Sequence, residues 1–314
     1  ILAMVLYFVY GGRLNKPNNI YKEVLKSSTS ITGVRVASSL VQPIIALIIP
    51  ARLISAGYTS AQAMSIFGIA LGMTMPLLFI PVTLVGSLSM VLIPDISTAI
   101  VKNDTEHVNN RISSSILFTL VITFLMIPLY IGAGDNIGLF FYDNLQSGQL
   151  LTAAAWTMLP FALINITSSI LNALGLEVKS FVNYIVGSIF MFICIIFLPK
   201  LIGIRALILG MGSCVTVASL LNIRMIKKKT NLKLNLFKPI LKLSIISLPT
   251  AALTYFVTSL LSNFMPLFFN LAISCTLGAI MFVLLCMVFK ILNIQSMFVE
   301  VKTYFKSKKK KKVS

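Results

Sequence analysis

Long apolar segments alternate with short polar ones along this chain. The apolar segments lie at roughly 29–53, 64–94, 112–132, 149–173, 180–199, 201–223, 240–261 and 266–291. A helix that crosses a bilayer needs about 20 mainly apolar residues, so each segment predicts a transmembrane helix. The second segment contains Pro76, Pro81 and Pro94, which predicts a kinked or tilted helix.

Residues 1–10 (ILAMVLYFVY) form a shorter apolar run. They are too few to span a membrane, and they lack the basic start and cleavage site of a signal peptide. We expect them to be the end of a transmembrane helix, with a short interfacial segment as the alternative. The pattern thus predicts about eight full spans plus one partial span.

The composition supports a membrane protein over a water-soluble one. Apolar residues make up 57% of the 314 and charged residues only 11%, with a mean hydropathy of +0.96. Soluble domains have roughly 45–50% apolar and about 25% charged residues. The polar residues are too few to cover the surface of a soluble core, whereas a lipid solvent needs no such cover.

The net charge of +18 follows the membrane topology. The basic polar segments are 11–28, 95–111, 174–179, 224–239 and the tail after 291, whereas 54–63, 133–148, 200 and 262–265 hold almost no Lys or Arg. The positive-inside rule therefore predicts that loop 224–239 and the C-terminus are cytoplasmic. The lysine run 308–312 is expected to lie near anionic lipid headgroups and not on nucleic acid.

Two polar stripes stand out within the apolar segments. Arg35 lies about two turns inside the first full segment, and Ser38, Ser39 and Gln42 follow on the same helix face. The fourth segment repeats the spacing with Asn165, Ser168, Ser169 and Asn172. Charges within a span usually face a protein interior or an aqueous cavity, so the stripes predict two walls of one hydrophilic cavity.

From these stripes we predict the following substrate-binding residues: Arg35, Ser39, Gln42, Asn165 and Ser169. A guanidinium binds phosphate oxygens bidentately, so Arg35 is expected to bind phosphate or pyrophosphate. The alternative is that Arg35 snorkels to the cytoplasmic interface. For the second stripe the alternative is that small polar residues join helices by hydrogen bonds.

Two further features are candidates for helix packing and for ion coupling. Gly68 and Gly72 form a G-x-x-x-G, which predicts close helix approach. Asp95, after Pro94, is expected to cap a helix or pair with a basic neighbour, and it is the coupling-ion candidate.

The sequence contains none of the motifs that would indicate an enzyme or a metal site. His107 is the only histidine and is expected in a polar loop. The four cysteines lie in apolar runs without paired spacing, which predicts buried thiols rather than a metal or disulfide framework. The sequence has no Walker motif or H-E-x-x-H, so we expect no enzyme, no cofactor and no metal.

Three stretches resemble the stage V sporulation protein B family. They are the I-P-x-R-L-x-x-A-G-Y turn at Ile49 to Tyr58, the G-x-x-x-G-M-x-x-P-L-L-x-x-P helix at Gly68 to Pro81, and the L-x-P-x-I-S helix end at Leu92 to Ser97. The turn near Lys179 is similar to the family's G-x-G-K turn, although Leu174 and Leu176 depart from its glycines. The family is a polysaccharide-flippase branch of the multidrug/oligosaccharidyl-lipid/polysaccharide exporters.

The resemblance implies an all-α, multidrug-exporter-like (MATE-like) fold with two lobes around a central cavity, of which this chain is a C-terminal part carrying the second lobe. Arg35 matches the family's basic position in helix seven. The implied organisation is 1–10 the end of a truncated helix, 11–28 a cytoplasmic inter-lobe loop, 29–223 the second six-helix lobe, 224–239 a basic cytoplasmic loop, 240–291 a C-terminal helix pair and 292–314 a basic cytoplasmic tail.

The function implied is a flippase that moves a lipid-linked (undecaprenyl-pyrophosphate type) oligosaccharide or peptidoglycan precursor across the cytoplasmic membrane, in spore-cortex or cell-envelope synthesis. The alternative is a cation-coupled multidrug antiporter, which should carry acidic residues in mid-span. A membrane scaffold ranks last because the loops are short.

Overall fold

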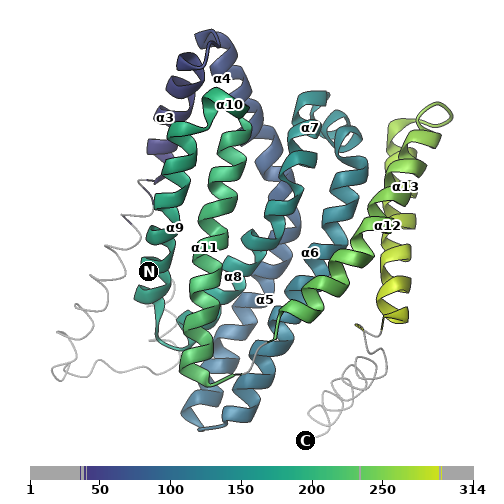
Figure 1. The fold of residues 1–314 in the computed structure, drawn as a ribbon. Helices are drawn as coiled ribbons and strands as arrows, with labels where there is room; N and C mark the ends of the chain where they lie inside the picture. The colour runs from purple at the N-terminus through teal and green to yellow at the C-terminus, as the bar shows by residue number, and fades with distance from the viewer. Residues whose placement is uncertain (1–35, 37–38, 40, 233–234, 290, 292–314) are drawn as a thin grey trace, which may run out of the picture. The chain divides into compact units, whose positions relative to one another are not determined.

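The computed structural model describes residues 36, 39, 41–232, 235–289 and 291 (Figure 1). The chain divides into two units, Ile1–Ile44 and Ile45–Ser314, and the architecture below is that of the second. The predicted partial span at 1–10, the loop 11–28 and the tail 292–314 lie outside the described residues.

Every regular element in the described ranges is a helix. The elements are α3 (Val41–Ser55), α4 (Ser60–Gly68), η1 (Ile69–Thr74), α5 (Met75–Val101), α6 (Thr105–Tyr142), α7 (Leu145–Ala154), η2 (Ala155–Thr157), α8 (Met158–Ala173), α9 (Glu177–Phe197), α10 (Pro199–Ile202), α11 (Arg205–Thr230), α12 (Phe237–Leu261) and α13 (Leu267–Val288).

Seven helical stretches are long and apolar enough to cross a membrane. They are 60–101, 105–142, 145–173, 177–197, 205–230, 237–261 and 267–288. Each coincides with one of the predicted segments, and α3 covers the described part of the first segment, 29–53. The prediction of an all-α, multi-pass membrane protein is therefore confirmed.

The proline-rich second segment is one continuous helical stretch with a π-helical turn. This turn, η1, ends directly before Met75 and Pro76, and the Met75 N–H donates to the Ala70 carbonyl five residues earlier. Pro76 has no N–H to offer the carbonyl four residues before it, and a π turn is a common way to absorb such a gap. The irregularity lies at η1, while Pro81 and Pro94 are accommodated inside α5.

Several helices continue beyond their apolar segments. The predicted loop 133–148 is wrong because α6 runs to Tyr142, and loop 224–239 is shorter than predicted because α11 runs to Thr230. His107 likewise lies in the first turn of α6 and not in a loop, and its N–H donates to the N-cap carboxylate of Asp104 at 2.9 Å. Hydrophobicity marks only the part of a helix in hydrocarbon, so it cannot show a polar continuation.

The core of the second unit forms where α5, α6 and α8 pack together with α11, α12 and α13. Ile112 and Ile116 of α6 and Ile166 of α8 are fully buried there. Helix α9 packs along α11, and α6 packs against both α7 and α12. Large apolar side chains such as Met90 and Leu248 remain exposed, which suits a surface in contact with lipid.

Close helix contacts depend on glycines other than those predicted. A Cβ on Gly68 or Gly72 would meet no other described atom within 4 Å, so none of the described helices approaches this G-x-x-x-G closely. A Cβ on Gly148 of α7 would instead lie 2.6 Å from the Cα of Asp135 in α6. On the other side of α6, a Cβ on Gly132 would lie 2.7 Å from the Cβ of Thr254 in α12.

Candidate functional site

The first predicted polar stripe lies mostly outside the described residues. Arg35 and Ser38 are not described, and Gln42 lies in α3 without a described side chain. Ser39 is exposed, and its hydroxyl donates to the Val36 carbonyl at 2.8 Å. The roles of Arg35, Ser39 and Gln42 therefore stay predictions.

The second stripe, on α8, divides into two sets of residues. Asn165 is exposed and Ser169 partly exposed. The Asn165 amide donates to the Phe161 carbonyl at 3.0 Å, and the Ser169 hydroxyl donates to the Asn165 carbonyl at 2.9 Å. Both bonds stay within α8, so these two side chains join no other helix through them and keep polar atoms available at the helix surface.

Ser168 belongs instead to a polar network that joins α8, α9 and α11. At its centre is the fully buried Asn222 of α11, whose carbonyl oxygen accepts from the Asn183 amide at 2.8 Å. The Asn222 amide donates to Ser168 at 3.2 Å and contacts Ser180 of α9 at 3.4 Å. For Ser168, the alternative of hydrogen bonding between helices is thus confirmed.

Sequence reasoning missed Asn183 and Asn222. Each is a polar residue within an apolar helix, and Ser180 and Asn183 lie three residues apart on one face of α9. A similar signal was present in α11, where Ser219 lies three residues before Asn222. Its partners come from two other helices, so only the fold brings them together.

Asp95 forms an ion-pair cluster between the end of α5 and the start of α6. Its Oδ2 lies 2.6 Å from Nε of Arg111, and its Oδ1 lies 3.2 Å from Nε2 of His107. Both partners are on α6, one turn apart. The expectation that Asp95 pairs with a basic neighbour is confirmed, and the cluster is partly exposed to solvent.

Metal-binding chemistry has no visible basis in the described part of the chain. No group of three or more His, Cys, Asp or Glu residues there could hold a metal ion. Of the cysteines, Cys214 and Cys286 are buried thiols, whereas Cys194 and Cys275 are only partly buried.

Comparison with known proteins identifies a structural relative. No family profile and no curated protein sequence matches the chain. Among solved structures, it is similar to the lipid II flippase MurJ in an inward closed conformation, with a TM-score of 0.63 over 91% of this chain. The chain has the fold of the matched part of MurJ. The sequence identity is 17%, and the match spans 58% of the MurJ chain, so the likeness establishes the all-α, multidrug-exporter-like fold alone.

Proposed function

We propose that this chain supplies one lobe of a transporter that moves a lipid-linked oligosaccharide or peptidoglycan precursor across the cytoplasmic membrane by alternating access. The observation that supports it is the structural likeness to a lipid II flippase over 91% of the chain. The motifs at Ile49 to Tyr58 and Leu92 to Ser97, within α3 to α5, favour the stage V sporulation protein B branch and a role in cell-envelope or spore-cortex synthesis.

The substrate contacts in this proposal come from two helices. Arg35 binds the pyrophosphate, because a guanidinium stays charged and matches phosphate oxygens in a bidentate geometry. Ser39 and Gln42, which the sequence predicts on the same helix face, support it. Asn165 and Ser169 of α8 contact the sugar, since their side chains form no hydrogen bond to another described helix.

Asp95 is the coupling-ion candidate. In the structure its carboxylate is compensated by Arg111 and lies beside His107. A proton or cation that bound Asp95 would compete with Arg111 and loosen the contact between α5 and α6. Such a competition would give the cluster two states that an ion gradient can shift.

Translocation of labelled lipid II in proteoliposomes tests the proposal. We expect Arg35→Ala to lower the rate at least tenfold, because the pyrophosphate loses its bidentate partner. Arg224→Ala, at the cytoplasmic end of α11 in the proposed topology, removes the same charge and should keep most of the rate. Asp95→Asn should remove the dependence of the rate on the ion gradient.

The outcome that would overturn the proposal is equally specific. An intact protein that moves no lipid-linked precursor but exports cationic drugs against a cation gradient would be an antiporter. A translocation rate that Arg35→Ala leaves unchanged would remove Arg35 from the substrate site.

A further inference from the structure

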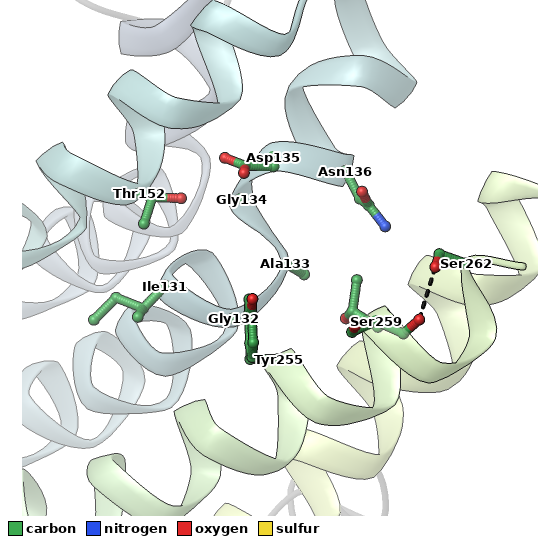
Figure 2. Close-up of a pocket in the computed structure, with 11 residues that line it drawn as sticks. Ile131, Gly132, Ala133, Gly134, Asp135, Asn136, Thr152, Tyr255, Ser259 and Ser262 are labelled. Carbon is green, nitrogen blue, oxygen red and sulfur yellow. Dashed lines mark hydrogen bonds between the residues drawn. The ribbon is translucent and has the colours of Figure 1, made fainter.

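A polar cavity lies between α6, α7 and α12, away from all the residues assigned above (Figure 2). Its volume is about 290 Å³. Residues 131–136 of α6 form one wall and Thr152 of α7 another. Tyr255, Thr258 and Ser259 of α12, with Ser262 directly after it, form the third. The glycines of α6 bring the two flanking helices close, so backbone contacts on both sides define the cavity.

The charge of the cavity is negative. Asp135 is the only Asp, Glu, Lys, Arg or His among its described lining residues, and it forms no ion pair in the described part of the chain. In Figure 2, Asp135 and Asn136 lie at one end of the cavity, between Thr152 and the serines of α12. A carboxylate without a protein cation beside it favours a cationic ligand.

The other lining groups mostly accept hydrogen bonds or can do so. Thr152 donates its proton to the Tyr130 carbonyl at 3.3 Å, so its oxygen can only accept from a ligand. The Thr258 hydroxyl is buried at the cavity wall without a partner among the described residues. Ser259 adds a further hydroxyl.

The cavity lies where the apolar segment predicted within α6 ends. Asp135 follows the apolar segment 112–132 by one turn of α6. Beyond it, exposed phenylalanines gather at the ends of α6 and α13, where the ring centroids of Phe140 and Phe268 lie 5.9 Å apart. Tyr255 lines the cavity and is 67% exposed. A headgroup-level pocket beside lipid-facing aromatic side chains is accessible from the bilayer.

We propose that this cavity binds a primary ammonium group. Such a group offers three N–H donors and one positive charge, which match the Asp135 carboxylate and the surrounding acceptors. Tyr255, which also lines the cavity, adds an aromatic side chain that can contact a cation. Two sources share this chemistry: the amine headgroup of an aminophospholipid, and a soluble amine.

Size and ligand number exclude two other occupants. Pockets that enclose drug-sized ligands measure roughly 300–1,000 Å³, so this cavity is too small for a lipid-linked oligosaccharide. Calcium takes six to eight oxygen ligands at about 2.3–2.6 Å, and a single carboxylate in an open cavity does not supply such a cage. The ammonium site is independent of the proposed transport.

Native mass spectrometry of the full chain tests the site. The protein is offered equimolar phosphatidylethanolamine and phosphatidylglycerol, and then N-acetylated phosphatidylethanolamine, which lacks the charge. We expect the wild type to retain phosphatidylethanolamine over the other two. Asp135→Asn should weaken this retention roughly tenfold, because the charge-assisted hydrogen bond is lost.

Asp143→Asn is the matched control. It removes the same charge near the same end of α6, outside the cavity, and asparagine tolerates the left-handed conformation of this position. Selection lost in Asp135→Asn but kept in Asp143→Asn supports the lipid source. Binding of ethanolamine that depends on Asp135, without lipid selection, supports the soluble source. Equal binding by wild type and Asp135→Asn in both assays, or binding of sodium ions alone, overturns the proposal.

Discussion

At the scale of single residues, the amides of Asn222 and Asn165 lie in different environments. Asn222 is fully buried and bonds residues on α8 and α9, whereas Asn165 is exposed and bonds only its own helix. A polar side chain at a helix–helix contact contributes to stability, and one at the helix surface is available to a ligand. The two roles can therefore be separated by measuring stability and transport on the same variants.

We expect Asn222→Ala to lower the free energy of unfolding by about 1–3 kcal/mol, because it leaves the buried Asn183 amide without its acceptor. Asn165→Ala should leave stability within about 0.5 kcal/mol of the wild type, as is usual for exposed sites. Denaturation in detergent micelles measures both. If Asn165 contacts the substrate, Asn165→Ala lowers lipid II translocation without this loss of stability. Equal destabilisation by the two variants would contradict the distinction.

At the scale of elements, hydrophobicity located the helices but not their ends or their contacts. The segment 112–132 correctly predicted α6, yet Gly134 and Gly138 fell in the predicted loop 133–148. In the structure both glycines lie inside α6, where α7 approaches its backbone. Glycine indicates both turns and close packing, and only the neighbouring helices decide between them.

The glycines of α6 and α7 give a prediction about helix packing. Gly148→Ala should destabilise the fold by about 1–3 kcal/mol, because the new methyl group would overlap the α6 backbone at Asp135. Gly72→Ala should be neutral or stabilise by up to about 1 kcal/mol, since alanine is the better helix former and the position is open. Unfolding midpoints of the two variants in the same detergent provide the comparison. A loss for Gly72→Ala as large as that for Gly148→Ala would show that residues beyond the described part pack on Gly72.

At the scale of the whole molecule, the sequence predicted the fold class because lipid imposes a strong pattern. Every span must be long and apolar, so the pattern of hydrophobic residues located the segments that match the seven long helices of the described chain. The polar sites were harder to predict from the sequence. The ion pairs of Asp95 with His107 and Arg111 form because a short turn joins α5 to α6 and brings the two helices together. The Asp135 cavity forms only where three helices pack. Residues brought together by tertiary packing leave no periodic signal in the chain.

The charge pattern still makes a testable statement about the whole molecule, namely its orientation. Lys227, Lys228 and Lys229 end α11, whereas the turn after α6 at the opposite end of the alternation carries Asp143 and no Lys or Arg. The positive-inside rule then places Lys228 in the cytoplasm and Gln146, at the start of α7, outside.

Both positions are exposed and suit a cysteine label. In intact cells, a membrane-impermeant maleimide should label Gln146→Cys, and it should label Lys228→Cys only after permeabilisation. The unsubstituted chain gives the background from its four native cysteines, which lie in transmembrane helices. The reverse labelling pattern would invert the topology and would place the Asp135 cavity at the cytoplasmic leaflet.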